Sequence, residues 1–304
     1  MKDIFKLFKA SEQKEEVVSS TTKTSRDMME STSESATMSV TTNIGGRRYR
    51  IESDDNYLQD IKGVFEPHMV ELFDALLCPS FTVLDIGANI GCTSILFGSR
   101  VEKVISFEPS PTTFSFLRKN VAAAELSNVS LMNIGLGKEN GSFELTFAAD
   151  NRSGGFVSNK VQASAGHSVE KIKIAQGDAF LSEHPVETIG LIKIDVEGFE
   201  KDVIEGLRTT ISRQKPIVVL ELNHWCLNVF QRISVPDFLD FLRSVFPFLY
   251  AVEKDEARNL HDPNDAYHVM YHHVVGGFKY PNLVGAFHVD QLEKFAAKYR
   301  INIG

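Results

Sequence analysis

The loop DIGANIG at residues 85–91 contains the residue types that suit a bound small molecule. Gly87 and Gly91 allow the backbone to turn sharply and allow a ligand to approach closely. An apolar run precedes the loop and a helical pattern follows it, so the unpaired N–H groups of a helix start lie just beyond. We therefore expect this loop to bind a carboxylate or a phosphate group.

The spacing of the glycines separates two kinds of ligand. A dinucleotide loop reads G-x-G-x-x-G, whereas here Asn89 stands two residues after Gly87 and the next glycine is Gly91. The D-x-G-x-x-x-G pattern that results suits the methyl donor S-adenosyl-L-methionine better than a pyrophosphate. The alternative for this loop is a tight strand-to-helix turn that binds no ligand.

A second acid, Glu108, ends the next apolar run in the string ISFEP at residues 105–109. In doubly wound folds an acid about 20 residues after the start of the loop accepts hydrogen bonds from ribose hydroxyls. Glu108 has about this separation from Asp85. We predict that Glu108 binds the ribose of a nucleoside; the alternative is a surface acid before a helix.

Apolar runs and helical patterns alternate along most of the chain and must position these residues. The continuous apolar strands indicate a parallel sheet that helices cover on both faces. The predicted fold class is α/β: a doubly wound, mostly parallel, Rossmann-like sheet with an antiparallel closing strand. We predict strands at residues 82–86, 103–107, 129–134, 142–147, 171–174 (an edge strand), 191–194, 217–222, 250–252 and 268–275, and helices at 66–77, 92–97, 111–124, 199–207, 236–246 and 291–299.

Two segments differ from this pattern. Residues 1–45 are rich in Ser and Thr and poor in aromatic residues, which predicts a disordered tail before one domain at residues 46–304. The apolar and Lys residues at positions 2–9 leave a short membrane-surface or partner-docking helix as an alternative to a solvated tail. Residues 148–170 are rich in Gly and Ser, and we predict a long loop that could cover a substrate.

The composition excludes several classes of protein. The net charge of −8 argues against a broad nucleic-acid surface, and we expect no nucleic-acid partner. The three cysteines form no CxxC pair, so we expect reduced thiols and neither a zinc site nor disulfides. No apolar run reaches the roughly 18 residues that a membrane span needs. With no secretory signal recognisable at the N-terminus, we expect a cytoplasmic protein without stable membrane insertion.

A third segment, IKIDVEGFE at residues 192–200, completes a recognisable set with VLDIGANIG at 83–91 and FEP at 107–109. Together these segments resemble the FkbM-type methyltransferases over roughly residues 62–250, including FEP at 65–67. The resemblance implies a class I methyltransferase fold and S-adenosyl-L-methionine as the cofactor. It also implies methylation of hydroxyl groups on sugars, lipids or natural products, but it does not identify the acceptor.

The resemblance also implies roles for individual positions. Asp85, Gly87 and the stretch from Asn89 to Gly91 would hold the methionine part of the donor, and Glu108 its ribose. Adenine would lie near Asn133 and Ile134, at the end of the strand that starts at residue 129. Asp178 matches an acid that the family often has before a helix, and we assign it no role.

Methyl transfer to a hydroxyl group needs a base that removes the proton. Asp195 and Glu197 end the strand at residues 191–194, on the edge of the sheet where ligands bind, and could share a direction if the strand continues. They are our first choice for positioning or base chemistry, and Glu221 or His224 at the end of the next strand is the second.

Each of these acids has an alternative role. Glu197 could complement the dipole of the following helix, and Lys193 could pair with a neighbouring acid. Asp195 and Glu197 could hold a divalent ion, but no third ligand is evident, so we predict no metal. We interpret His272 and His273 as ordinary strand histidines, because adjacent strand residues point to opposite faces.

We therefore predict an S-adenosyl-L-methionine-dependent O-methyltransferase that acts on a glycan, a lipid or a small metabolite. N-methylation is a second enzymatic possibility, since it depends less on a base. A donor-binding protein without catalysis is a possibility of another class. Asn89 argues against an NAD-dependent reductase, because it interrupts the dinucleotide fingerprint.

Overall fold

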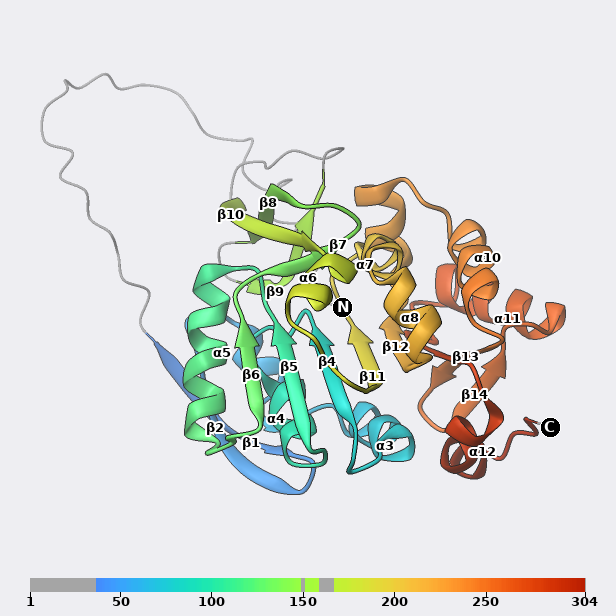
Figure 1. The fold of residues 1–304 in the computed structure, drawn as a ribbon, viewed down its shortest axis with the longest axis horizontal. Helices are drawn as coiled ribbons and strands as arrows, with labels where there is room; N and C mark the ends of the chain where they lie inside the picture. Colours follow the sequence, from blue (N-terminus) through green and yellow to red (C-terminus); the bar gives the residue numbers. More distant parts are fainter. Residues whose placement is uncertain (1–36, 149–150, 159–166, 304) are drawn as a thin grey trace, which may run out of the picture.

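The computed structural model describes residues 37–148, 151–158 and 167–303 (Figure 1). Its centre is one eight-stranded sheet, in which five neighbouring strands run parallel and the closing strand β15 runs antiparallel to both its neighbours. The strands, in their order across the sheet, are β14 (Glu256–Asn259), β13 (Phe248–Glu253), β15 (Asn282–Ala286), β12 (Ile217–Glu221), β11 (Ile189–Ile194), β4 (Thr82–Ile86), β5 (Lys103–Phe107) and β6 (Val129–Met132).

The order of the parallel strands creates a crevice. From β4 the chain continues outward through β5 to β6, and it later returns to the other side of β4 with β11 and β12. Ligands of open α/β sheets bind at such a reversal, outside the carboxyl ends of the strands. The loop after β4 and the acids after β11 both lie at this point.

Helices cover both faces of the sheet, as the continuous apolar strands predict. Alternate residues of a strand enter two separate cores; in β4, Val83 belongs to one and Leu84 to the other. The first core is covered by α3 (Pro67–Leu76), α4 (Cys92–Gly98), α5 (Pro111–Ala123) and α12 (Glu293–Tyr299). The second is covered by α6 (Gly177–Glu183), α7 (Glu200–Gly206), α8 (Arg208–Gln214), α10 (Val235–Val245) and α11 (Pro263–Val274). Short helices α2 (Tyr57–Asp60), α9 (His224–Cys226), η1 (Leu227–Gln231) and η2 (Val289–Leu292) join these elements.

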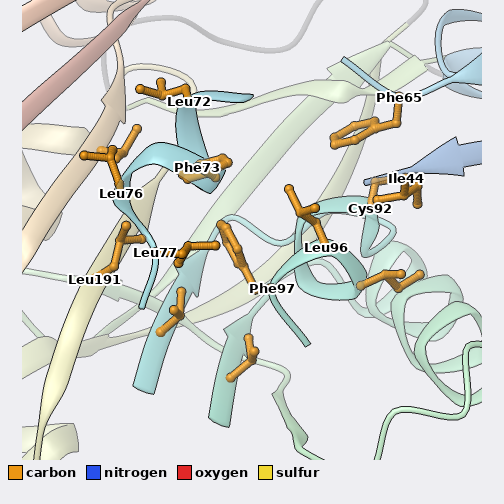
Figure 2. Packing of buried hydrophobic residues seen from close by; sticks show 14 of the residues in the cluster. Ile44, Phe65, Leu72, Phe73, Leu76, Leu77, Cys92, Leu96, Phe97 and Leu191 are labelled. Carbon is orange, nitrogen blue, oxygen red and sulfur yellow. The ribbon is translucent and has the colours of Figure 1, made fainter. Parts of the chain in front are cut away.

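Packing in the first core fixes two helices that reach the site. Phe73 of α3 and Phe97 of α4 are fully buried and meet edge to face, with ring centroids 4.7 Å apart (Figure 2). Full burial of such a side chain contributes roughly 1.5–3 kcal/mol. This contact holds α3 and α4 together on the same side of the sheet.

The folded part of the chain begins earlier than the sequence predicts. Residues 1–36 of the expected tail lie outside the described residues, but β1 (Met38–Ile44) pairs with β2 (Arg47–Ser53) and with β3 (Gly63–Val64). Alternating Val40, Thr42 and Ile44 turn toward the core, and a two-glycine turn with positive φ follows. The Ser- and Thr-rich composition hides this short hairpin signal.

The predicted loop at residues 148–170 is partly wrong. β9 (Asn151–Val157) and the start of β10 (His167–Gln176) occupy much of it, and residues 149–150 and 159–166 lie outside the described residues. With β7 (Gly135–Gly137) and β8 (Gly141–Ala148) they form a sheet of order β7-β10-β8-β9, so β10 is an inner strand and not the expected edge. Gly154 and Gly155 lie within β9, which explains why its composition suggested a loop.

The closing strand is also not where the sequence places it. Residues 268–274 belong to α11 and Val275 is its C-cap. The N-cap Asp262 accepts hydrogen bonds from the N–H groups of Asn264 and Asp265. Ala266, Val269 and His273 are buried at helical spacing, so the period is that of a helix and not of a strand. The antiparallel strand is β15, farther along the chain.

Other predicted elements are confirmed. β4 and β5 have the predicted bounds, and Ser110 caps α5 by accepting a hydrogen bond from the Thr113 N–H at 3.1 Å.

Cys78, Cys92 and Cys226 are all free thiols. Within the described ranges, none of the helices combines the length and the apolar character of a membrane span.

Candidate active site

The loop between β4 and α4 adopts the strained backbone that its glycines permit. Gly87, Asn89 and Gly91 have φ of 78°, 50° and 99°. A Cβ atom on Gly87 would lie 1.9 Å from the carbonyl oxygen of Asp195, so the close approach that requires glycine is that of the β11 end. The turn is as predicted. Position 87 requires glycine because of the neighbouring protein backbone, and not only because a ligand could approach it.

Glu108 lies directly beside this loop. Its Oε2 accepts a hydrogen bond from the Asn89 N–H at 3.0 Å, and its Oε1 accepts one from the Ser110 N–H at 2.9 Å. The residue is 7% exposed, and burial raises the pKa of its carboxyl group to about 7. Each oxygen keeps a lone pair that a ribose hydroxyl can use.

A first cavity of about 100 Å³ opens above these residues, and we name it the donor cavity. Gly87, Asn89 and Glu108 line it from the sheet, and Asp195 and Glu197 line it from the end of β11. The small sheet forms its opposite wall, through Leu145, Arg152, Ile172 and Ile174. The cavity therefore joins the predicted nucleoside residues to the predicted catalytic acids.

Four predicted donor residues lie beside this cavity and not in its described lining: Asp85, Gly91, Asn133 and Ile134. Asp85 is fully buried and accepts hydrogen bonds from the hydroxyls of Thr93 and Ser94, at 2.8 and 2.7 Å. Its strand position turns it toward α4, so it supports the loop from below. Asn133 is exposed and donates to the Glu108 carbonyl oxygen, while Ile134 packs against the second core.

Gly135 and Leu136 line the donor cavity just beyond those two positions. The strand β6 ends at Met132, earlier than the sequence predicts, and the chain then bends into β7. A Cβ atom on Gly135 would lie 3.3 Å from Ile174 and 3.4 Å from Pro109, so these two side chains pack closely on it. Gly91 faces Leu117 of α5, so it serves helix packing.

Lys193 ties the donor loop to β11. Its Nζ donates to the Gly87 carbonyl oxygen at 2.7 Å and lies 3.4 Å from a carboxylate oxygen of Asp85 and of Asp195. Burial alone would lower the pKa of Lys193, but the charges of Asp195 and Asp85 outweigh it and raise the pKa above its ordinary value. The predicted pairing of Lys193 with a neighbouring acid is observed with two acids.

A second cavity of about 270 Å³ adjoins the donor cavity, and we name it the acidic cavity. Asp195 lines both cavities, and Glu66 and Glu221 line only the second. Met69, Phe73 and Pro281 give it an apolar wall. Glu66 is a site residue that the sequence did not single out, although the string FEP at 65–67 belongs to the resemblance.

Three carboxylates meet between the cavities. Oxygens of Asp195, Glu197 and Glu221 lie within 4.8 Å of one another, so Glu221, the second-choice acid, joins the first-choice pair as a possible third ligand for a metal ion. Asp195 follows β11 directly, and Glu197 reaches the same space through a turn with φ of 52°. Strand alternation is therefore not what brings them together.

Glu197 and Glu221 are held in a charge-rich environment. Glu197 Oε2 accepts from Asn223 Nδ2 at 3.1 Å and from the Cys226 thiol at 3.2 Å. Burial, reinforced by the charge of Asp195, raises the pKa of Glu197 to about 8. Burial and the charges of Glu197 and Asp195 raise the pKa of Glu221 well above its usual range.

A different acid, Glu200, accepts hydrogen bonds from the backbone at the start of α7. Glu200 Oε1 accepts from the N–H groups of Val196 and Gly198, at 3.2 and 3.1 Å. Glu200 thus occupies the place that the dipole alternative gave to Glu197, and Glu197 faces the cavity instead.

His224, the other second-choice base, lies apart from the described linings of both cavities. Its ring packs on Phe278, and its backbone N–H donates a hydrogen bond to Nε2 of His273 at 3.3 Å. His273 is a buried helix residue, and burial lowers its pKa to about 4. Asp178 accepts from the N–H groups of Thr209 and Thr210, so it caps α8.

The strand order, the crevice at the reversal and the two joined cavities define an α/β protein of the class that binds nucleoside cofactors. The methyltransferase FkbM domain matches residues 85–246, more than half of the chain, and the chain belongs to the FkbM methyltransferase family. The predicted resemblance to this family and the predicted α/β fold class are confirmed. The methyl donor of the family is S-adenosylmethionine.

Several known proteins are similar to this chain. Methyltransferase 1 of Beauveria bassiana is 29% identical over 143 residues, which are 41% of this chain and 57% of that protein. Methyltransferase sdnD of Sordaria araneosa is 27% identical over 178 residues, covering 48% and 67%. Hexuronic acid methyltransferase AglP of Haloferax volcanii is 28% identical over 140 residues, covering 44% and 53%. The chain thus spans little more than half the length of the first of these relatives.

Among solved structures, the methyltransferase FkbM from Methylobacillus flagellatus superposes with a TM-score of 0.40 at 16% sequence identity. The superposition covers 69% of this chain and 45% of that chain.

Proposed function

We propose that this chain transfers the methyl group of S-adenosylmethionine to a hydroxyl group of a glycan, a lipid or a small metabolite. The observation that carries the proposal is that Asp195 lines two adjoining cavities. One of them holds the buried acid Glu108 and the strained loop, and the other holds carboxylates suited to a base. A donor and an acceptor could thus meet at Asp195.

The donor cavity fits a nucleoside joined to an amino acid. Glu108 offers carboxylate lone pairs for the ribose hydroxyls, and Gly135 and Leu136 line the part of the cavity where a base would lie. Asp85 and Lys193 hold the loop in place from beneath. When bound, S-adenosylmethionine supplies an activated methyl group, so the protein mainly orients the partners and excludes water.

The acids between the cavities supply the base. An acceptor hydroxyl placed beside Asp195 has Glu197 and Glu221 within reach, and a carboxylate can take its proton as the oxygen bonds to the methyl carbon. The bond from that carbon to the donor sulfur would break at the same time, with S-adenosylhomocysteine as the leaving group. A base is most effective when its pKa lies near the working pH, and the pKa of about 8 places Glu197 in that range. We assign proton removal to Glu197, and positioning of the hydroxyl to Asp195 and Glu221.

One relative supports a sugar acceptor. The name of AglP gives a hexuronic acid, an anionic sugar, as the acceptor of that protein, and we carry over only that the acceptor is a sugar. N-methylation would depend less on the three acids. The cytoplasmic location and the absence of a nucleic-acid partner stay predictions.

The first experiment measures donor binding by calorimetry with S-adenosylhomocysteine. We expect micromolar affinity in the unchanged chain, its loss in Glu108→Ala, and no effect of Glu102→Ala, which removes an exposed acid near the start of β5. No binding to the unchanged chain would refute the proposal.

The second experiment is a labelled-donor screen against glycans and small metabolites. Label transferred to hydroxyl oxygens supports the proposal, and label found on nitrogen favours the N-methyltransferase. Tight binding with no transfer to any compound favours a non-catalytic binding protein.

A further inference from the structure

We propose that the acceptor group in the acidic cavity is an uncharged polyol, such as a neutral sugar ring, and not an anionic or a cationic one. This inference rests on the proposed function, because it assumes that the acidic cavity receives the acceptor. The cavity adjoins the donor cavity at Asp195 and has a volume of about 270 Å³. That space suits one sugar-sized group.

The lining of the cavity disfavours an anion. Glu66, Asp195 and Glu221 line it, and Glu197 lies beside the last two. Among the described residues that line it, Lys193 is the only cation. Its ammonium group is buried, donates to the Gly87 carbonyl oxygen, and lies 3.4 Å from both Asp85 and Asp195.

Burial and the neighbouring acids raise the pKa of Glu66 and of Glu221, so the cavity disfavours each added negative charge. A carboxylate on the acceptor would meet the same penalty without a free counter-charge. Like charges a few ångströms apart repel strongly in a partly buried site, even with an effective dielectric constant of about 20. We expect kcat/KM to be at least roughly tenfold higher for a neutral sugar than for an anionic one. Solvent at the rim of the cavity screens part of the repulsion and limits the preference.

The cavity presents hydrogen-bond acceptors, so its ligand must supply the donors. Oε2 of Glu221 is buried and has no hydrogen-bond partner among the described residues. Buried acceptors of this kind are normally satisfied, and neighbouring hydroxyls of a polyol can donate to Glu221 and Asp195 together. The apolar side chains of Met69 and Pro281 suit the C–H face of a sugar ring.

A cationic acceptor would satisfy the same carboxylates, but it would lie next to the donor. The reacting methyl group is carried by a sulfonium cation, and a second positive charge within bonding distance of it would be repelled. A neutral polyol meets both demands, because it brings hydrogen-bond donors without charge.

The test uses the full chain and labelled S-adenosylmethionine with a total extract of the cells that make the protein. The unreacted donor, itself a cation, is removed before acid hydrolysis releases the labelled units. Label released as volatile methanol comes from a methyl ester and is counted as transfer to an anionic acceptor, and the remaining units are separated on anion- and cation-exchange columns. We expect most of the label to pass through both columns. Label retained mainly on either column would overturn the inference while leaving the methyltransferase proposal intact.

A pair of variants makes the charge argument specific. Glu66→Lys brings a cation to the rim of the acidic cavity, and we expect it to raise the labelled fraction retained on the anion-exchange column several-fold. Glu102→Lys, which changes an exposed acid away from both cavities, should leave the fractions unchanged. Equal effects of the two variants would contradict the inference.

Two further readouts separate the possible failures. Calorimetry with S-adenosylhomocysteine on the same samples tests the donor site alone, so absent binding together with absent transfer refutes the proposed function itself. Parallel reactions with EDTA and with Mg²⁺ test whether a cation sits on the three acids. Transfer that stops in EDTA and returns with Mg²⁺ would overturn the charge argument, because the bound ion would supply the missing counter-charge.

Discussion

The ammonium group of Lys193 donates a hydrogen bond to the carbonyl oxygen of Gly87 across 2.7 Å. This bond joins β11 to the loop after β4, and the same ammonium group lies 3.4 Å from a carboxylate oxygen of Asp85. Lys193 is 4% exposed, so water contributes little to this arrangement. The lysine thus positions the donor loop without lining the donor cavity.

Replacing Lys193 with Met should weaken both folding and donor binding. The substitution leaves the fully buried Asp85 without its counter-charge, and removing one partner of a buried pair costs about 3–5 kcal/mol. We expect that loss in the free energy of unfolding by urea, and at least a tenfold loss of S-adenosylhomocysteine affinity by calorimetry. Lys103→Met, at an exposed position of β5, should change neither quantity. An unchanged affinity in Lys193→Met would contradict the positioning role.

The positions that the sequence predicts well are those whose environment is local. The runs at residues 82–86 and 103–107 are buried on both faces, so apolar continuity identifies them. The acidic cavity could not be predicted in the same way, because Glu66 and Glu221 lie far apart in the chain and meet only through the strand order. The helix at residues 263–274 was missed because its cap, Asp262, precedes a segment with many polar and aromatic residues.

Donor affinity should fall as the pH falls below about 7. The pKa of Glu108 is raised by burial to about 7, so its carboxyl group becomes protonated below that pH. A protonated acid has less capacity to accept the two ribose hydroxyls, and the loss approaches tenfold per pH unit. Calorimetry with S-adenosylhomocysteine between pH 6 and 8 measures this. Glu108→Gln should bind weakly with little dependence on pH; a steep dependence in that variant would rule out Glu108 as the titrating group.

The unliganded chain should be less stable at pH 8 than at pH 6.5. The pKa values of Glu200 and Glu197 are raised by burial to about 7 and about 8, above the ordinary value of 4.5. The folded state therefore binds more protons than the unfolded state in this range, and stability decreases as pH rises toward 8.

Below pH 6.5 an opposite effect begins. His273 has a pKa lowered by burial to about 4, so the unfolded chain takes up a proton there that the folded chain does not.

Glu221→Gln should raise the free energy of unfolding at pH 8 by about 1–2 kcal/mol, because it removes one repelling charge. Urea unfolding at several pH values checks both points; a stability that rises from pH 6.5 to 8 would be inconsistent with the buried acids.

The assignment of the base to Glu197 is open to a direct comparison. Glu197→Gln should lower kcat by roughly 10²–10⁴, the usual contribution of a general base, with little change in S-adenosylhomocysteine affinity. His224→Gln should retain most of kcat, because that ring packs on Phe278 apart from both described linings. In the unchanged enzyme kcat should rise with pH toward about 8, following the pKa of Glu197. The reverse ranking of the two variants would transfer the role to His224.

Gly87→Ala should be far more damaging than Gly46→Ala, although both glycines have positive φ, 78° and 91°. At Gly46 nothing lies within 4 Å of an added Cβ, so the cost is the backbone strain of roughly 1–2 kcal/mol alone. At Gly87 the Cβ would lie 1.9 Å from the Asp195 carbonyl oxygen, so β11 must move away from the loop.

That movement would separate Lys193 from its acceptor and displace Asp195 from the boundary between the two cavities. We therefore expect Gly87→Ala to lose both several kcal/mol of unfolding free energy and measurable donor binding, whereas Gly46→Ala should retain wild-type affinity. Urea unfolding and calorimetry with S-adenosylhomocysteine measure the two quantities. Similar behaviour of the two variants would show that the contact between Gly87 and β11 does not set the geometry of the donor loop.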